Sequence, residues 1–540
     1  LAPQLYQFPG VEINARTFRE YPYGKLTAHV LGYIGRISTK DVEKLTEAGR
    51  QDLYRGTTHI GKLGLESYYE PQLHGVPGMQ EVEKDAMGNI IRVLNNTPAQ
   101  AGQTLRLAMD IRMQQKADEL LGNRRGAVVA IDPQTGGVLA LVSKPSFDPN
   151  LFIDGIDSEN WKALNENWET PMINRTIQGL YPPGSTFKPF MAMAILESGK
   201  LPQSSIVPAP GAWSIPGSKH QYRDSVRSGH GAVNLQRAIT VSSDTFFYRI
   251  GYEMGIDKVS PYLKQFDLGQ ITGIDLPNES KGILPSKEWK RERFKKSPKN
   301  QEWQPSEMVS ISIGQGYNTY TPLQMAHATA TLANNGVVYR PHVVKELHNH
   351  QTQEITLVDP KPERTLPFKQ SNFDYIKKGM EGVLRPGGTG WRVGSGLQYT
   401  MAGKTGTAQV KSIAQGKSYN AAALSVQHRD HAWFIAFAPV DKPKIAIAVI
   451  LENGGWGATA APVARQLADF YLLKILGQGT AEELSTPQGM SVLADETLIS
   501  EGSKTSLACL QADFAAATQA PQAASGVQPC FQTTTHPNAS

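Results

Sequence analysis

Two pairs of apolar segments, one early in the chain and one near its end, constrain the fold most strongly. Gly126–Asp132 and Val138–Ser143 are joined by a turn from Pro133 to Gly137. His431–Pro439 and Lys444–Leu451 repeat the arrangement. Short apolar runs bounded by turn residues predict β-hairpins, and we expect the first hairpin to be central in a sheet.

A further strand and several helices complete the predicted sheet. Met401–Val410 is glycine-spaced with β-compatible flanks, which indicates a strand whose backbone another segment approaches closely. We expect it beside the second hairpin. Helices are predicted after Asp110, Ser185 and Gln236, and a closing helix at 461–476. These elements together predict an α/β sandwich.

The length of 540 residues allows two or more domains and a core large enough for an enzyme. Residues 1–105 have mixed elements without obvious chemistry, and we interpret them as an elongated accessory domain. The strands and helices above lie in residues 106–478. Residues 479–540 have little apolar pattern, which predicts a disordered tail. Cys509 and Cys530 lie in that tail, and we assign them no structural role.

Composition excludes some classes of function. A net charge of +5 is small for this length; it argues against a dedicated nucleic-acid binder and suits an anionic membrane surface or cell wall. The 40% apolar and 19% charged residues are typical of a globular protein. No apolar run approaches the roughly 18 residues of a membrane span. The chain begins at Leu1 inside a globular-looking segment, so we expect upstream sequence to be missing.

The first chemical motif is Tyr181–Lys188, in which two prolines and a glycine precede a predicted helix that starts near Ser185. Ser185 and Lys188 are three residues apart, so they share one face of that helix. A serine becomes a nucleophile when a neighbour takes its proton, and a lysine can do so if it is buried or lies near another cation. An S-x-x-K pattern is common by chance and is weak evidence alone.

Two further stretches strengthen this interpretation. Ser242-Ser243-Asp244 lies between apolar flanks, at a predicted junction of two helices, although Ser and Asp are also ordinary helix caps. Lys404-Thr405-Gly406-Thr407 resembles the end of a phosphate loop, but the required first glycine would fall at Gln398. The glycines of Ile311–Gly316 also lack the spacing of a dinucleotide loop.

Together the three stretches are far more specific than any one of them. Ser185-x-x-Lys188, Ser242-x-Asp244 and Lys404-Thr405-Gly406 resemble, in order and spacing, the three motifs of the penicilloyl-serine transferases. Over about residues 1–476 the chain resembles class B high-molecular-weight penicillin-binding proteins, and most of all their elongation-specific branch, the penicillin-binding protein 2 group. The segments that carry this likeness are Pro22–Gly24, Ala28–Tyr33, Gly64–Glu70, Asp110–Gln114, Tyr181–Lys188, Asp244–Tyr248, Gly314–Gly316, Thr321–Gln324, Gly388–Trp391 and His431–Phe434.

The resemblance implies a fold. It is an α/β penicilloyl-serine transferase (serine β-lactamase-like) domain, here residues 106–478, behind an elongated N-terminal pedestal domain. Residues 1–105 would be a partial pedestal of the dimerisation type, without its beginning and without the membrane helix of the family.

The resemblance also implies roles for the motif residues. Ser185 would attack a D-alanyl-D-alanine peptide, with Lys188 as proton acceptor and Ser242 as proton relay. Asp244 would hold Lys188 or the substrate amide. Lys404 across the cleft favours the neutral form of Lys188 and Asp244 its charged form, so the sequence leaves the protonation of Lys188 open.

Substrate binding is implied for the third motif. Thr405, Gly406 and Thr407 would contact the substrate, with Thr405, Thr407 and Lys404 on its terminal carboxylate. The backbone N–H groups of Ser185 and Thr407 would form the oxyanion hole.

The resemblance implies peptidoglycan stem peptides as substrates, inhibition by β-lactam antibiotics, and no cofactor. The implied partners are a SEDS-family glycosyltransferase and an MreC-like protein of the elongation machinery; nucleic acid is not expected. The implied location is the bacterial inner membrane, reached through the missing N-terminal helix, with the catalytic domain in the periplasm.

Three alternatives remain open. A serine β-lactamase or D,D-carboxypeptidase would use water as acceptor, although the long N-terminal part and the absence of an E-x-x-L-N loop argue against a lactamase. A non-catalytic scaffold role is the second. Asp224 and His230, with His220 nearby, suggest a metal site, but Pro208–Ala209 and Ser243 would complete it poorly. We therefore expect no metal there and a solvated loop instead.

Overall fold

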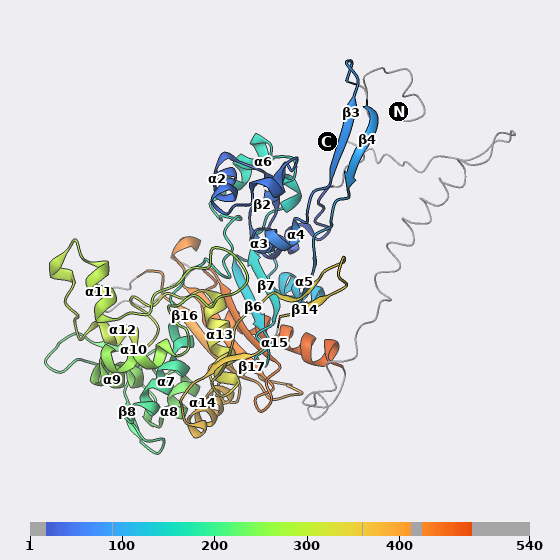
Figure 1. Ribbon diagram of the computed structural model, residues 1–540. Coiled ribbons are helices and arrows are strands. Elements are labelled where there is room, and N and C mark those ends of the chain that lie inside the picture. The colour runs from blue at the N-terminus through green and yellow to red at the C-terminus, as the bar shows by residue number, and fades with distance from the viewer. Residues whose placement is uncertain (1–17, 89, 359, 412–423, 478–540) are drawn as a thin grey trace, which may run out of the picture. The chain divides into compact units, whose positions relative to one another are not determined.

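The computed structural model describes residues 18–88, 90–358, 360–411 and 424–477 (Figure 1). The chain divides into two units, Leu1–Ser485 and Thr486–Ser540. The second unit, with Cys509 and Cys530, and the predicted tail at 479–540 lie outside the described residues. Among the described helices, none has the length and apolar character needed to cross a bilayer.

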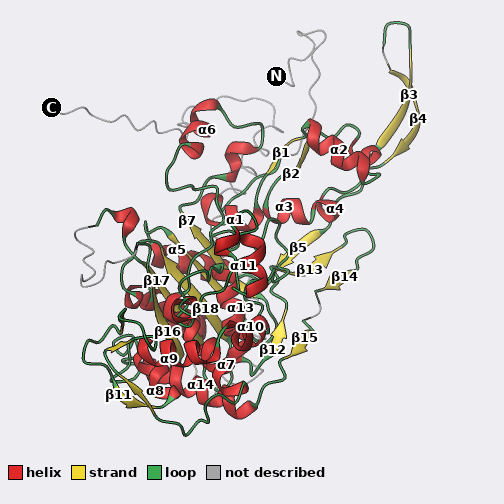
Figure 2. Ribbon diagram, turned by 90° about the vertical axis from the view of Figure 1, so that its left-hand side faces the viewer, coloured by secondary structure: helices red, strands yellow, loops and turns green. Residues whose placement is uncertain are grey.

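The first unit is built on a five-stranded antiparallel sheet with the order β16-β17-β18-β6-β7 (Figure 2). Its strands are β6 (Gly126–Ile131), β7 (Val138–Lys144), β16 (Ala402–Ala408), β17 (His431–Ala438) and β18 (Ile445–Leu451). Both predicted hairpins are confirmed, and the pairing of β18 with β6 joins them. The strand that carries Lys404 lies at one edge, beside β17 as expected.

The prediction that the first hairpin is central is wrong for its second strand, because β7 forms the other edge of the sheet. Its side chains are buried because α5 (Ile111–Leu121) packs along it. Asp110 caps α5, as predicted. Gln114 of α5 accepts from the Leu141 N–H at 2.8 Å and donates to the Leu141 carbonyl at 2.7 Å. A helix thus satisfies edge groups that would otherwise need another strand.

Alternate side chains of the strands enter two buried clusters. Val129 and Ile435 belong to the cluster shared with α7 (Lys188–Glu197) and α13 (Pro322–Ala333). Val128 and Phe434 belong to the opposite cluster, shared with α5 and α15 (Ala461–Asp469). A π-helical turn, η10 (Phe470–Ile475), continues α15, so the predicted closing helix is confirmed. With both faces covered, the sheet forms the predicted α/β sandwich.

The other elements of this part surround the sheet. The helices are α6 (Ser158–Asn165), α8 (Leu235–Val241), α9 (Asp244–Met254), α10 (Ile256–Lys264), α11 (Lys287–Arg293), α12 (Glu307–Ile311) and α14 (Gln370–Val383). The short strands are β8 (Val207–Ala209), β9 (Ala212–Trp213), β10 (Tyr222–Arg223), β11 (Gly231–Val233), β12 (Val337–Tyr339), β13 (Val344–His348), β14 (Ile355–Leu357) and β15 (Pro362–Thr365).

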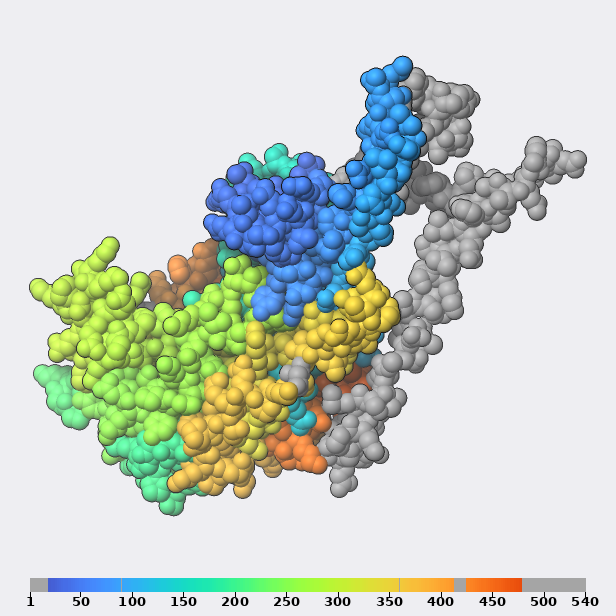
Figure 3. All heavy atoms as spheres, in the orientation of Figure 1, coloured from blue at the N-terminus to red at the C-terminus, as the bar shows by residue number. Residues whose placement is uncertain are grey.

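The described N-terminal part is made of short elements. They are α1 (Ala28–Leu31), β1 (Ile34–Arg36), α2 (Thr39–Glu47), β2 (His59–Gly61), α3 (Gly64–Tyr68), α4 (Glu70–Leu73), β3 (Met79–Lys84), β4 (Ile90–Thr97) and β5 (Thr104–Leu107). The β3–β4 hairpin projects from its neighbours (Figure 3), and β4 is exposed along its whole length.

The N-terminal part contacts the sheet part through the segment after β7. Tyr33 stacks on Phe152 with ring centroids 4.0 Å apart, and the His59 ring lies 2.7 Å from the Ile153 carbonyl. β5, at the predicted domain boundary, pairs with β13.

Candidate functional site

Ser185 lies in the turn just before α7, a helix that packs in the core on one face of the sheet. The chain forms a 3-10 turn, η5 (Gly184–Phe187), and α7 begins only at Lys188, so the predicted start of the α-helix is three residues too early. In a 3-10 turn, residues three apart lie on the same side, which keeps Ser185 and Lys188 on one face. The Ser185 side chain is half-buried.

Glycines let this turn approach the edge strand, as the spacing in 401–410 predicted. Gly184 has a φ of +54°, and a Cβ atom there would lie 2.5 Å from the Thr407 carbonyl oxygen. A Cβ atom on Gly406 would lie 2.8 Å from the Pro183 carbonyl oxygen. Any larger residue at either position would push the turn that carries Ser185 away from β16.

Lys188 is fully buried and directed at the second motif. Its Nζ atom donates to the carbonyl of Ser242 at 2.7 Å and to the hydroxyl of Ser242 at 3.2 Å. It also forms an ion pair with Asp244 at 2.5 Å. The face of the Phe247 ring lies 5.5 Å from the same nitrogen. The ammonium of a buried lysine is therefore compensated by one carboxylate and by oxygen acceptors.

The second motif forms the predicted junction of two helices. α8 ends at Val241, Ser242 adopts the left-handed conformation with a φ of 60°, and α9 begins at Asp244. Ser243 caps α9 by accepting from the Phe246 N–H. A non-glycine residue in this region is strained, and such strain is concentrated at functional sites. The turn presents Ser242 and Asp244 to the two lysines.

Lys404 reaches the same serine from the edge strand. Its Nζ atom donates to the Ser242 hydroxyl at 2.8 Å and to the Thr405 carbonyl at 3.1 Å. Burial lowers the pKa of Lys404 well below its ordinary value, the charge of Lys188 lowers it further, and Asp244 opposes both. Ser242 therefore lies between the two lysines, as the resemblance implied.

The remaining residues of the third motif are held by loops on both sides of β16. The hydroxyls of Thr405 and Thr389 are 2.7 Å apart. The hydroxyl of Thr407 accepts from the Gly457 N–H at 3.0 Å, which leaves its hydrogen free to donate to a carboxylate.

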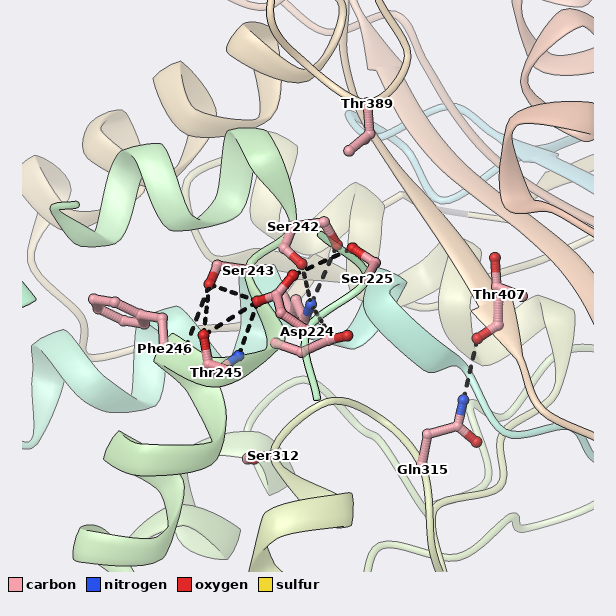
Figure 4. A network of polar contacts seen from close by, with 12 residues as sticks. Asp224, Ser225, Ser242, Ser243, Thr245, Phe246, Ser312, Gln315, Thr389 and Thr407 are labelled. Carbon is pink, nitrogen blue, oxygen red and sulfur yellow. Dashed lines mark hydrogen bonds and ion pairs between the residues drawn. The ribbon is translucent and has the colours of Figure 1, made fainter. Parts of the chain in front are cut away.

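The backbone of Thr407 faces the turn that carries Ser185. Gln315 donates to the Thr407 carbonyl at 3.1 Å (Figure 4), so this carbonyl points away from β17. In a strand the N–H and C=O of one residue point to the same side. The Thr407 N–H therefore also faces away from β17, on the side of the turn that carries Ser185.

Sequence reasoning missed Gln315, Thr389 and Gly457 as parts of the site. Gln315 follows Gly314, whose carbonyl accepts from the Gly184 N–H at 2.9 Å. The glycines on either side of Gln315 and of Thr389 are visible signals, and both stretches are among the segments that carry the resemblance, but neither residue was assigned to the site.

The expected solvated loop is confirmed for residues 225–228, which are exposed, and is wrong for Asp224. Asp224 is buried and accepts from the Ser243 hydroxyl at 3.0 Å and from the Thr245 N–H at 3.1 Å. Its other oxygen lies 3.1 Å from Nε2 of His230. His220 packs against Tyr222 instead. In the described ranges no three His, Cys, Asp or Glu side chains gather as metal ligands would.

The chain matches two family models. Residues 126–469 match the penicillin-binding protein transpeptidase domain, and residues 1–107 match the penicillin-binding protein dimerisation domain. Peptidoglycan D,D-transpeptidase MrdA of Acinetobacter baumannii is 47% identical over 470 residues, which are 87% of this chain and 68% of that protein. MrdA of Escherichia coli is 43% identical over 469 residues, 87% of this chain and 73% of that protein.

Solved structures agree. Pseudomonas aeruginosa PBP2 in complex with WCK 5153 is 39% identical, with a TM-score of 0.72 over 87% of this chain and 95% of that one. Helicobacter pylori PBP2 in its complex with MreC is 32% identical, with a TM-score of 0.75 over 88% of this chain and 82% of that one. The chain belongs to the class B penicillin-binding proteins, in the penicillin-binding protein 2 branch of serine-type peptidoglycan D,D-transpeptidases.

Proposed function

We propose that peptidoglycan crosslinking by this chain during cell elongation proceeds through an ester on Ser185. The observation that carries the proposal is the hydrogen-bonded series Lys188–Ser242–Lys404, set against the turn that carries Ser185. It supplies a base, a relay and a second amine within one buried site.

The reaction follows from these positions. The Ser185 Oγ atom bonds to the carbonyl carbon of the penultimate D-alanine while its proton moves to Lys188. The peptide C–N bond breaks, and the nitrogen of the leaving D-alanine takes a proton through Ser242. The amine of a second stem peptide then attacks the ester carbon, the bond to Ser185 breaks, and the serine regains its proton.

Lys188 has to be neutral to accept a proton, and its contact with Asp244 favours the ammonium. The series through Ser242 offers a route by which a proton leaves Lys188 for the Lys404 amine, whose pKa burial has lowered. A substrate carboxylate bound by Lys404, Thr405 and Thr407 would stabilise the charged form of Lys404 and favour that transfer.

The oxyanion that develops in both steps would be bound by the backbone N–H groups of Ser185 and Thr407. Removal of one such donor typically costs roughly 3 kcal/mol of transition-state stabilisation. Gly406 contributes by its lack of a side chain, because it allows the Ser185 turn to approach β16.

We also propose the setting of the reaction. The stem peptides and β-lactams acylate Ser185 in the periplasm, with the chain anchored in the inner membrane by sequence that precedes it. Residues 1–105, 106–478 and 479–540 act as pedestal, catalytic domain and tail. Partners would be an MreC-like protein and a SEDS-family glycosyltransferase; the support is likeness to PBP2 bound to MreC and, at 28% identity and a TM-score of 0.70, to a peptidoglycan synthase complex.

Labelling with a fluorescent penicillin tests the nucleophile. We expect one label per chain on the peptide that contains Ser185, retained for hours, and none in Ser185→Ala. Ser198→Ala is a matched control, because Ser198 ends the same helix and donates only to the Ile195 carbonyl. Labelling of Ser185→Ala would refute the assignment, and rapid loss of label from the unaltered chain would indicate a hydrolase.

A further inference from the structure

A buried carboxylate outside the three motifs holds the second motif in place. Asp224 lies between β10 and β11, and its side chain has no exposed area. Its Oδ2 atom accepts from the Ser243 hydroxyl at 3.0 Å and the Thr245 N–H at 3.1 Å, and the Thr245 hydroxyl oxygen lies 3.2 Å from it (Figure 4). Ser243 and Thr245 are the residues on either side of Asp244, which pairs with Lys188. The Oδ2 atom of Asp224 therefore contacts both neighbours of Asp244.

The other oxygen ties the carboxylate to its own loop. Oδ1 accepts from the Val226 N–H at 3.2 Å and from the Ser225 hydroxyl at 3.3 Å, and Nε2 of His230 lies 3.1 Å away. Thr245 is held a second time, because its hydroxyl lies 2.7 Å from the Pro210 carbonyl. The loop and the first turn of α9 are therefore one hydrogen-bonded body.

The charge of Asp224 acts on the site as well. Burial raises the pKa of Asp224, but hydrogen bonds from the Thr245 and Val226 N–H groups and the charge of Lys188 outweigh burial and hold the pKa below its usual value. Because the interaction between two charges is mutual, the carboxylate of Asp224 and the amine of Lys188 act on each other inside the site. The other titratable groups near Asp224 are His230 and Tyr248, with Tyr222 beside Tyr248, and those near Lys188 are Asp244 and Lys404.

The turn it holds is strained and functional. Ser242 has a φ of 60°, a conformation that a serine keeps only where its neighbours impose it. The following residue, Ser243, is fully buried and hydrogen-bonded to Asp224. A shift of this turn would move the Ser242 hydroxyl away from Lys404 and Asp244 away from Lys188, and displacements of about 1 Å in an active site can cost roughly 100-fold in rate.

We propose that Asp224 is a positioning residue of the acyl-transfer site, whose carboxylate clamps Ser243 and Thr245 and so fixes where Ser242 and Asp244 meet the two lysines. The inference rests on the proposed function, because it assumes that Ser242 and Asp244 act with Lys188 on Ser185. The loop at 224–230 thus supports catalysis through the position and the charge of Asp224.

Two substitutions separate these effects. Asp224→Asn keeps the size of the side chain and removes its charge, whereas Ser243→Ala removes the hydrogen bond to Asp224, together with the cap on the Phe246 N–H, and keeps the charge. Asp275→Asn is the matched control: Asp275 is buried, accepts from the Val343 and Val344 N–H groups at 2.6 and 2.8 Å, and lies next to Tyr69 rather than the site. The measurement is the second-order rate of penicillin labelling across pH, with melting temperatures beside it.

We expect Asp224→Asn to label Ser185 about 10- to 100-fold more slowly at the plateau of the pH profile. Its acidic limb should move to lower pH, because the site has lost a buried anion. Ser243→Ala should lower the plateau and leave the limb in place. Asp275→Asn should leave plateau and limb unchanged even if it lowers the melting temperature.

A folded Asp224→Asn protein with the unaltered plateau and limb would overturn the inference, as would an equal loss of rate in Asp275→Asn. If Asp224→Asn does not fold, an unaltered plateau in Ser243→Ala overturns it, and a lowered one supports it. Failure of the proposed function is distinguishable, because the unaltered chain would then carry its label on a residue other than Ser185.

Discussion

Lys404 lies 2.8 Å from the hydroxyl of Ser242, and this contact joins the edge strand of the sheet to the junction of α8 and α9. Lys188 reaches the same hydroxyl from α7 at 3.2 Å. Three segments far apart in the sequence thus share one oxygen atom. The predictions below follow from the charges and hydrogen bonds around it.

The carboxylate of Asp244 should set the acidic limb of the reaction. Asp244→Asn removes an anion from the buried site, so the acidic limb of penicillin labelling should move to lower pH while labelling at neutral pH persists. Rates measured across pH check this, with Asp257→Asn as control, because Asp257 is an exposed residue of α10. A limb that stays in place, or moves to higher pH, would show that the charge of Asp244 does not act on the reaction.

Removal of Lys404 should stabilise the fold while abolishing acylation. Burial lowers the pKa of Lys404 in the folded chain, whereas in the unfolded chain it is about 10.4. Between these values the unfolded state binds the extra proton, so this lysine lowers the free energy of unfolding as pH falls, by about 1.4 kcal/mol per pH unit. Above about pH 10.4 this lysine does not lower the free energy of unfolding. The free energy of unfolding then falls as the pH is lowered from about 10.4 to the pKa of Lys404 in the folded chain.

Lys404→Met should therefore melt at a higher temperature than the unaltered chain at neutral pH, and the difference should shrink toward pH 10. Thermal melts at several pH values measure it. Exposed Lys296→Met is the control, for which no pH-dependent difference is expected. Equal or lower stability of Lys404→Met at neutral pH would contradict the buried, easily deprotonated lysine.

Gln315 should orient the oxyanion hole. Its side-chain amide donates to the Thr407 carbonyl at 3.1 Å. This hydrogen bond holds the part of β16 in which the Thr407 N–H faces the turn that carries Ser185. Gln315→Leu should slow acylation by about 10-fold, less than the 100- to 1000-fold typical of losing a donor itself. Gln301→Leu is the control, because Gln301 is also half-buried and donates to a carbonyl, that of Phe294, at 3.2 Å. Equal labelling rates in both variants would remove Gln315 from the site.

Glu452 should stabilise the segment that leads into the turn of Ser185. Its buried carboxylate pairs with Arg125 at 2.5 Å and Arg175 at 2.8 Å, and accepts from the Tyr181 hydroxyl at 2.6 Å. Glu452→Gln leaves the buried guanidinium of Arg175 and the partly buried one of Arg125 without a counter-charge, which should cost about 3 kcal/mol or more. Calorimetry should show a clear fall in melting temperature, and the exposed pair partner Glu292→Gln should show none.

Much of the fold is local in origin and could be predicted. The apolar runs of β6, β7, β17 and β18 need only period and turn residues to be recognised, and Asp110 caps α5 through the Arg112 N–H, two residues away. The edge position of β7 could not be predicted in this way, because the backbone groups of Leu141 that face outward are bonded by Gln114, a side chain of another element.

The same division applies to the site. By itself the sequence determined the chemical groups, since Ser185, Lys188, Ser242, Asp244 and Lys404 stand in motifs whose internal spacing is short. Only the tertiary structure decided which groups support them: Asp224 beneath Ser243, Gln315 on Thr407 and Thr389 beside Thr405. These hydrogen bonds join residues that no helical or strand period relates, so they exist only once distant segments have packed together.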